Sequence, residues 1–400
     1  MTSTSTPVAL GTEFVQDPYS LYRQLRIEAP VREVVMPRGL KVWLVTRYAE
    51  AREVLTNPAV HKDLRPVQHL FTRHQTRTST GDFGAELTAH MLNSDPPDHT
   101  RLRKLVAKAF TMRRVELLRP RIEEITANLL DGLSGEVDLI DEFAFPIPVT
   151  VICELLGVPH EDHDDFRQWS SDLVSATSRE KVGAAGLAMS GYLRALIDAK
   201  RAAPADDMLS ALIQAQDDGD ELTGIELTSM AFLLLIAGHE TTVNLIANGT
   251  LALLTNPDQL AMLRAEPTLL PGAIEEFLRY ESPVGHATLR YTTDSVDVGG
   301  TTIPDGEFVV VALGSANHDE TRFPTPDVLD VTRPATGHLA FGHGVHFCVG
   351  APLARLEGQI AIGRLIERFP DLSLATEVTD LSWRNSTLLR GMNALPVRVN

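Results

Sequence analysis

The sequence has 400 residues and a net charge of −17; 44% of the residues are hydrophobic, 22% are charged, and no long low-complexity tract is present. These values predict an ordered globular protein with a large buried core, and the acidic excess argues against binding to nucleic acid or to an anionic membrane surface. The two cysteines, Cys153 and Cys348, are too few for a disulfide framework, which is typical of a protein in a reducing cytoplasm.

The N-terminal quarter predicts a tail, a helix, a hairpin and a long loop. Residues 1–13 lack the basic and apolar regions of a secretion signal, so we expect a flexible tail ahead of one domain over 14–400. A short helix is expected over 17–29, and the turn-forming "PRG" between two apolar runs predicts a hairpin over 31–46. Residues 57–93 are polar and poorly periodic, which indicates a long functional loop with at most one short helix.

Residues 95–281 have a mostly helical pattern, and one of the expected helices is unusually long. It begins at Thr223 and Glu226, which have capping-box spacing, and ends before Pro257. Its roughly 32 residues would extend about 48 Å, yet its longest apolar run, "AFLLLIA", is too short for a membrane span. Its centre carries "GHETT" (238–242), whose polar groups cost about 1–3 kcal/mol each to bury without partners. We therefore expect this centre to be braced by other polar groups or to line a site.

The pattern changes after residue 282. Residues 287–311 alternate apolar and polar side chains between turn signals, which predicts short strands. A helix is expected over 350–368, and the segment from "LSWRNS" to the C-terminus predicts further strands. The expected fold class is therefore mainly α with a minor β part, in one large domain with a long central helix.

The segment "FGHGVHFCVGAPLARLE" (341–357) places a cysteine among glycines and directly before an expected helix. Glycines permit close backbone approach, and the N–H groups at a helix N-terminus stabilise a thiolate, so the loop is suited to hold one anionic sulfur. Three interpretations compete: a buried structural cysteine, a zinc site formed with His343 and His346, and a single thiolate on haem iron. The zinc site lacks an evident fourth ligand.

This segment resembles the haem-thiolate loop of the cytochrome P450 family, which reads phenylalanine–x–x–glycine–x–basic–x–cysteine–x–glycine. Every place is filled, by Phe341, Gly344, His346, Cys348 and Gly350. Further motifs agree in order and spacing over nearly the whole chain. The segment 237–242 resembles the oxygen-activation motif, the segment 99–103 the haem-contacting helix, and Glu276, Arg279 and Arg322 the ion network that braces the cysteine loop.

The resemblance implies the cytochrome P450 fold, haem b with Cys348 as the axial thiolate ligand of the iron, and dioxygen as co-substrate. It assigns contacts with the haem propionates to four cationic side chains, for each of which the alternative is an ordinary surface salt bridge. These are His99, Arg103, Arg290 and His346. The other cofactor contacts that it implies are Ala237, Gly238, Phe341 and Gly350.

The resemblance also implies catalytic roles for two neighbouring residues of the long helix. Thr241 would hydrogen-bond dioxygen, and Glu240 would help to deliver protons. The small residues before them would let dioxygen approach, and a hydroxyl that competes for a helical carbonyl would bend the helix. The alternative is a threonine packed within the helix beside an outward-facing glutamate.

The positions that line the substrate pocket in relatives are mostly small or apolar here, which predicts a hydrophobic substrate. The resemblance to bacterial secondary-metabolism members suggests a macrolide, another polyketide or a terpenoid. His286 could add one polar contact. The expected substrate-binding positions are Met91, Leu92, Leu233, Val284, His286, Thr288 and Leu388.

Residues 101–114 carry six basic side chains and no acidic one, against an acidic background. We interpret them as a docking face for an acidic ferredoxin, while the alternative is a merely solvated face. Because the chain has no flavin or nicotinamide domain, electrons are expected from a ferredoxin and its reductase. We expect a cytoplasmic monomer without nucleic-acid or membrane partners.

The leading functional prediction is a haem-thiolate monooxygenase that hydroxylates or epoxidises a hydrophobic small molecule. One alternative keeps the haem chemistry but performs oxidative coupling, desaturation or peroxide-driven oxidation. A second alternative is a non-catalytic recruitment module. Such a module should have lost the cysteine or the acid–alcohol pair, and this chain keeps Cys348, Glu240 and Thr241.

Overall fold

The computed structural model describes residues 7–75, 85–175, 179–217 and 220–400. Its contacts divide the chain into two compact units, each assembled from segments that lie far apart in the sequence. The first unit contains the described part of 1–79 together with 248–348 and 378–393, and the second contains the described part of 80–247 together with 349–377 and 394–400. One helix, α13 (Gly224–Leu254), continues from the second unit into the first.

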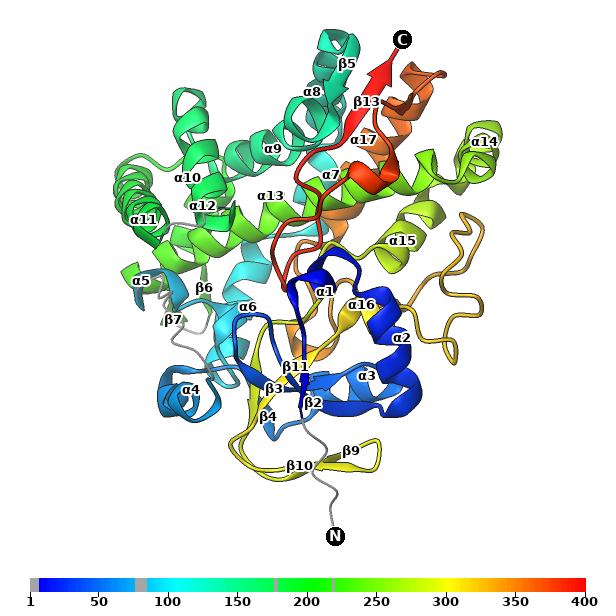
Figure 1. The fold of residues 1–400 in the computed structure, drawn as a ribbon. Helices are drawn as coiled ribbons and strands as arrows, with labels where there is room; N and C mark the ends of the chain where they lie inside the picture. The colour runs from blue at the N-terminus through cyan, green and yellow to red at the C-terminus, as the bar shows by residue number, and fades with distance from the viewer. Residues whose placement is uncertain (1–6, 76–84, 176–178, 218–219) are drawn as a thin grey trace. The chain divides into compact units, whose positions relative to one another are not determined.

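The first unit is built on a mixed sheet with the strand order β1-β2-β3-β11-β8-β4 (Figure 1). It contains an antiparallel hairpin, β2 (Val31–Val35) and β3 (Lys41–Val45), and β11 (Phe308–Val311) lies parallel to β3. The hairpin confirms the strands predicted over 31–46. The other strands are β1 (Val8–Ala9), β4 (Val60–His61) and β8 (Arg290–Thr292).

Both faces of this sheet are buried, because successive side chains of a strand point to opposite faces. On one face Val45, Val309 and Val311 pack with α3 (Tyr48–Thr56). On the other face Leu44, Phe308 and Val310 pack with α2 (Tyr19–Glu28). A separate hairpin, β9 (Val296–Val298) and β10 (Thr301–Ile303), turns at Gly299 and Gly300, whose φ values of 55° and 80° suit a two-residue turn. The remaining helices of the unit are α1 (Thr12–Gln16), α4 (Gln68–His74), α14 (Pro257–Ala265), α15 (Leu270–Tyr280) and α16 (Leu313–Ala316).

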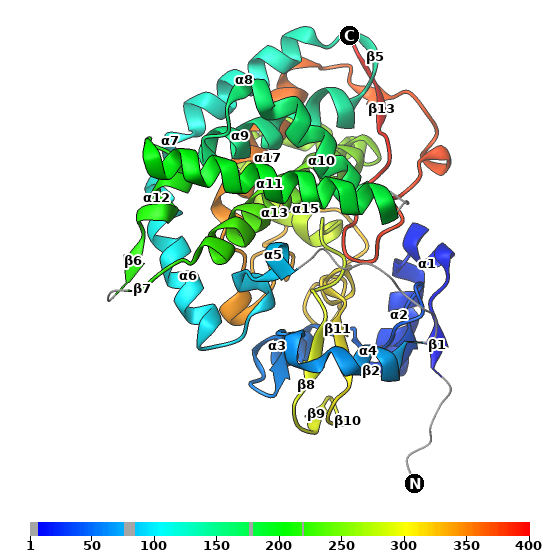
Figure 2. The ribbon, with the colours of Figure 1, turned by 90° about the vertical axis from the view of Figure 1, so that its left-hand side faces the viewer.

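The second unit is mainly helical (Figure 2). Helices α10 (His163–Ser175) and α11 (Arg179–Ala202) pack along each other, and α17 (Ala351–Arg368) packs on α8 (Arg119–Gly132). Its other helices are α5 (Ala85–Thr88), α6 (Asp98–Ala109), α7 (Met112–Leu117), α9 (Pro146–Leu156) and α12 (Met208–Gln214). Its strands are β5 (Gly135–Asp138), β12 (Ser373–Leu374) and β13 (Pro396–Val399), which form one sheet, and the short pair β6 (Gln216–Asp217) and β7 (Asp220–Glu221).

Helix α13 begins with the predicted capping box. The Thr223 N–H donates to the Glu226 carboxylate (2.8 Å), and the Glu226 N–H donates to Thr223 Oγ1 (3.3 Å). The helix is long and apolar enough to cross a membrane, but 78% of its most apolar stretch is buried inside the protein. It is therefore a core helix.

Three local predictions need correction. The segment 57–93 is more structured than a loop, because α4 buries Leu70 and His74 and three further short helices lie in its described part. Residues 1–6 of the expected tail lie outside the described residues, but β1 pairs with β2 and Leu10 is buried, so residues 7–13 belong to the fold. The C-terminal segment forms only one strand, β13, because residues 381–393 are held by side-chain contacts and isolated bridges.

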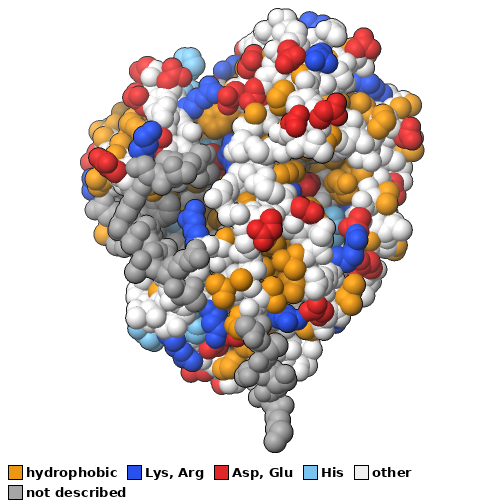
Figure 3. Space-filling view, viewed as in Figure 1, with side chains coloured by type: hydrophobic (Ala, Val, Ile, Leu, Met, Phe, Trp, Pro, Cys, Tyr) orange, Lys and Arg blue, Asp and Glu red, His pale blue; other side chains and the backbone are white. Residues whose placement is uncertain are grey.

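The surface carries charges of both signs. On the face that Figure 3 presents, Lys and Arg side chains are interspersed with Asp and Glu side chains, with no large patch of one sign.

Candidate active site

The cysteine loop ends the middle segment of the first unit. The Cys348 N–H donates a hydrogen bond to Phe341 O (2.9 Å), which closes the loop. Gly342 and Gly344 have φ values of 72° and 74°, which side chains rarely allow, and a Cβ on Gly344 would lie 2.8 Å from Thr56 Cγ2. The backbone turn therefore requires glycine at 342 and 344, and packing against α3 also requires it at 344.

Cys348 is exposed, whereas Cys153 is fully buried. Burial raises the pKa of the Cys153 thiol to about 12, so that thiol is inert, as a buried cysteine in an apolar helix predicts. The exposed Cys348 contradicts the interpretation of a buried structural cysteine. Among the described residues, no group of three or more His, Cys, Asp or Glu side chains could hold a metal ion, which contradicts the zinc interpretation.

The sequence that follows Cys348 starts a helix at once. Gly350 is the N-cap of α17, Ala351 is the first helical residue, and proline lies in the first turn. The first N–H groups of a helix lack partners within the helix, and the helix end carries partial positive charge. A sulfur three residues before this end is suited to be an anionic metal ligand.

Helix α13 presents a strip of small, partly accessible residues in the second unit. Ala237 is exposed and Gly238 and Thr241 are half-buried, although the helix around them is buried. Their spacing of four residues places Ala237 and Thr241 on one face of the helix. Gly238 also serves packing, since a Cβ there would lie 3.1 Å from Ile152 of α9. A flat apolar group fits such a strip, so both the strip and the cysteine loop suit haem.

The two hydroxyls in the centre of α13 donate to helical carbonyls. Thr241 Oγ1 donates to Ala237 O (2.8 Å), and Thr242 Oγ1 donates to Gly238 O (3.3 Å). The predicted competition for helical carbonyls therefore occurs. Because the single hydroxyl proton of Thr241 is used in this bond, its half-exposed oxygen is left as a hydrogen-bond acceptor.

The other polar groups of this centre are buried and braced. Glu240 is only 2% exposed, which contradicts the alternative of an outward-facing glutamate. His239 lies 2.6 Å from Ser170 Oγ of α10. Glu357 of α17 hydrogen-bonds with Thr242, and burial raises the pKa of Glu357 to about 8 against the opposing effect of that bond. Ser170 and Glu357 were not predicted, because nothing in the sequence relates them to the centre of α13.

The four cationic side chains that the resemblance assigned to propionates are divided between the units. In the second unit, His99 is buried and Arg103 is half-buried, four residues apart on α6. In the first unit, Arg290 of β8 is buried and His346 is half-buried. Contact of these four side chains with the haem propionates stays a prediction.

The predicted substrate-binding positions are likewise divided. In the second unit, Met91 and Leu233 are buried and Leu92 is half-buried. In the first unit, the structure brings the segments 284–288 and 386–389 together, since Gly285 N–H donates to Leu388 O (2.9 Å) and Val284 pairs with Leu389. Leu388 is exposed and Thr288 is half-buried. Substrate contact at these positions stays a prediction.

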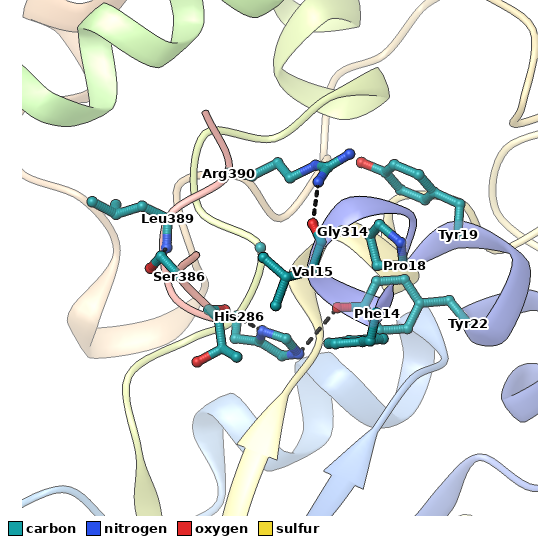
Figure 4. A pocket seen from close by; sticks show the side chains of 12 residues that line it. Phe14, Val15, Pro18, Tyr19, Tyr22, His286, Gly314, Ser386, Leu389 and Arg390 are labelled. Carbon is teal, nitrogen blue, oxygen red and sulfur yellow. Dashed lines mark hydrogen bonds between the residues drawn. The ribbon is translucent and has the colours of Figure 1, made fainter. Parts of the chain in front are cut away.

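His286 lines a small pocket of the first unit (Figure 4). Its Nδ1–H donates to Thr387 O, and its Nε2 accepts from the Tyr22 hydroxyl (3.0 Å). Burial lowers the pKa of His286 to about 4, so the ring is neutral. The free volume of about 30 Å³ suits water and not a substrate. Here His286 braces the loop at Thr387 with both ring nitrogens.

The ion network that supports the segment before the cysteine loop differs from the prediction in one residue. Arg279 donates to both oxygens of Glu276 (2.7 and 2.8 Å), and both side chains are fully buried. The second cation on Glu276 is Arg333 (3.1 Å). Arg322 instead donates to Thr336 O (2.8 Å) and lies over aromatic rings on the surface. The prediction of Arg322 was wrong, and the arginine of "DVTRP" was the signal that could have found the correct partner.

Together, the exposed cysteine before a helix and the acid–alcohol pair on a long core helix define a haem-thiolate protein. Comparison with known proteins agrees. The sequence profile of the family "Cytochrome P450" matches residues 149–387. "Cytochrome P450 107B1" of Saccharopolyspora erythraea is 56% identical over 98% of this chain and 97% of its own length. "Vitamin D(3) 25-hydroxylase" of Pseudonocardia autotrophica is 52% identical over 96% and 94%.

The solved structure of the P450 monooxygenase TamI with tirandamycin C bound has a TM-score of 0.91 and 53% identity, covering 98% of this chain and all of that one. The chain therefore belongs to the cytochrome P450 family and is a haem-thiolate monooxygenase, as its cysteine loop predicted. The cytochrome P450 fold is confirmed, mainly α with a minor β part.

Proposed function

We propose that this protein is a cytoplasmic tailoring monooxygenase that hydroxylates or epoxidises a hydrophobic secondary metabolite of the polyketide or terpenoid type. The observation that carries the proposal is the 53% identity with TamI, which binds tirandamycin C, over nearly the whole of both chains. The apolar character of the predicted substrate positions Met91, Leu92 and Leu233 supports it. Haem bound through Cys348 would supply the iron centre at which dioxygen is reduced and activated.

The substrate class is tested by a spectral-shift screen of the purified holoenzyme against polyketide and terpenoid libraries, with tirandamycin C as the first probe. We expect polyketides or terpenoids to displace water from the site and shift the Soret band at micromolar concentration. If only small polar compounds produced a shift, the proposed class would be wrong.

The residues of the chain divide the remaining tasks. His99, Arg103, Arg290 and His346 would neutralise the propionates. Thr241, whose own proton is held by Ala237 O, would accept a hydrogen bond and so hold a proton donor beside the open strip of α13. Glu240, buried next to it, would supply the proton. Proton delivery at this place favours oxygen transfer over the release of hydrogen peroxide.

Replacing Thr241 with alanine is expected to divert reducing equivalents into hydrogen peroxide. The variant loses the acceptor that orients the proton donor, so the ratio of product to hydrogen peroxide should fall about tenfold or more, while reductant consumption continues. Thr241→Ser keeps a hydroxyl that can donate to Ala237 O and should retain most of the coupling. If wild type and Thr241→Ala gave the same ratio of product to hydrogen peroxide, Thr241 would have no role in proton delivery.

The basic segment 101–114 supports an acidic electron donor. Arg101 is paired with Glu226 and Asp220 inside the second unit. Lys108 and Arg113 are exposed, and so are Met112 (61%) and Leu117 (69%), so this part of the chain presents both basic and apolar side chains to solvent. This composition is suited to transient docking of a ferredoxin, with charge steering the encounter.

Lys108→Glu is expected to weaken reduction by a ferredoxin severalfold at low salt, because it places a negative charge on the proposed docking face. The difference from wild type should shrink as salt is added, since exposed charges are screened beyond about 10 Å at 0.1 M. Lys181→Glu, on the exposed surface of α11, is the matched control and should change the rate little. The measurement is the second-order rate of reduction by stopped flow, and equal rates for the two variants would contradict the docking face.

A further inference from the structure

The centre of α13 contains a buried histidine for which haem, dioxygen and substrate give no role. His239 is 2% exposed and lies between α10 and the side chain of Glu240. Its Nε2 is 2.6 Å from Ser170 Oγ and 3.5 Å from Glu240 Oε1, and its Nδ1 is 2.8 Å from Leu235 O. The ring is thus held on both sides by atoms of the second unit.

The partners decide where the ring protons lie. A backbone carbonyl only accepts, so Nδ1 of His239 carries a hydrogen and donates to Leu235 O. In the neutral ring, Nε2 then presents a lone pair, which accepts from the Ser170 hydroxyl. An ionised Glu240 carboxylate at 3.5 Å would repel this lone pair. A proton on either Nε2 or the Glu240 carboxyl removes this repulsion. The protonated group can then donate a hydrogen bond to the other one.

The surroundings strengthen this interaction. The Phe145 ring meets the His239 ring edge-on at 5.8 Å and excludes water from one side. Charged groups on elements packed around the pair include Arg167 of α10, which lies over Phe145 at 4.8 Å, and Glu357 of α17, which contacts Thr242. Electrostatic interactions are stronger in such buried sites than in water. The protonation state of His239 and that of Glu240 therefore depend on each other.

We propose that His239 is a positioning residue for Glu240: fixed by Ser170 and Leu235, it shares one proton with the Glu240 carboxyl and keeps that carboxyl ready to donate. The inference rests on the proposed role of Glu240 in proton delivery. No net charge is created in the sharing, since the proton moves only between Nε2 and the carboxyl. Because Ser170 belongs to α10, the proposal also links the position of α10 to the state of Glu240.

The first test reads the ring directly. Holoenzyme with ¹⁵N-labelled histidine is studied as the diamagnetic ferrous carbon monoxide form, and the His239 ring signals are assigned with His239→Gln and followed against pH. We expect Nδ1 to remain protonated throughout, and the Nε2 signal at neutral pH to differ between wild type and Glu240→Gln, because Nε2 loses the group with which it shares a proton. An unchanged Nε2 signal in Glu240→Gln, or a deprotonated Nδ1, would overturn the proposal.

The second test reads the fraction of reducing equivalents recovered as hydrogen peroxide, with tirandamycin C as probe and across pH. His239→Gln can still hydrogen-bond to Ser170 but cannot share a titrating proton, so this fraction should rise and lose its pH dependence. We expect coupling to fall about tenfold, less than the 10²–10⁴-fold typical of removing a general acid. Ser170→Ala should give a smaller change in the same direction.

Ser229→Ala is the matched control, because Ser229 is a buried hydroxyl of the same helix whose oxygen has no hydrogen-bond partner among the described residues. It should behave as wild type. If Glu240→Gln itself leaves the hydrogen peroxide fraction unchanged, the proposed proton role of Glu240 fails. If Glu240→Gln raises the fraction and His239→Gln does not, the inference about His239 alone fails.

Discussion

Replacing Cys348 with alanine is expected to abolish reductant-driven oxidation and to remove the reduced carbon monoxide spectrum that is typical of thiolate ligation. Cys348 is the exposed cysteine of the chain, in a loop closed by its N–H bond to Phe341 O and followed directly by α17. Without the sulfur, the iron loses its electron-donating ligand, so we expect a fall in turnover on the order of 10³-fold or more. The measurements are turnover and the absorption spectrum of the reduced protein under carbon monoxide.

The control for this experiment is Cys153→Ala. Cys153 is fully buried and its raised pKa keeps it a thiol, so its removal should leave the spectrum unchanged and cost only the packing of one small side chain. Far-ultraviolet circular dichroism shows whether each variant is folded. A thiolate spectrum that survives in Cys348→Ala and disappears in Cys153→Ala would show that the assignment of the ligand is wrong.

The elements that could be predicted from the sequence are those fixed by local chemistry. The capping box at Thr223 and Glu226, the hairpin around "PRG" and the glycines of the cysteine loop each follow from the backbone conformation or the hydrogen bond that a few neighbouring residues impose. For the same reason, the ion pair of Glu276 and Arg279, three residues apart on α15, was predictable.

The partners that could not be predicted come from packing between distant segments. Ser170 meets His239 because α10 packs beside α13, 69 residues further along the chain. Arg322 and Arg333 lie in the same irregular segment and both follow plausible turns. Only the path of the backbone, in which Asp330 N–H also donates to Glu276 Oε1 (3.1 Å), brings Arg333 and not Arg322 to the buried carboxylate. The sequence could therefore predict that Glu276 needs cations but not which arginine supplies the second one.

Replacing Arg279 with methionine is expected to lower the free energy of unfolding by about 3–5 kcal/mol, because it leaves Glu276 as a buried carboxylate with only Arg333 to balance it. Arg279 also donates to Asn317 O (3.1 Å) and Pro326 O (2.8 Å), which would lose their partner. The measurement is urea unfolding of the holoenzyme, followed by circular dichroism and by the loss of the haem spectrum. We expect the cysteine loop to release haem at lower urea than in wild type.

The identity of the second cation provides the matched control. Arg322→Met removes an exposed arginine with one carbonyl bond and should cost about 0–1 kcal/mol, whereas Arg333→Met removes a cation that contacts Glu276 and should cost clearly more. In a double-mutant cycle, Arg333→Met should cost less free energy of unfolding in the Glu276→Gln background than in wild type, whereas the cost of Arg322→Met should not change. The effects of two substitutions are non-additive only when the two residues interact. If coupling to Glu276 appeared for Arg322 and not for Arg333, the network would be the one expected from the motif alone, and the geometry described for this segment would be wrong.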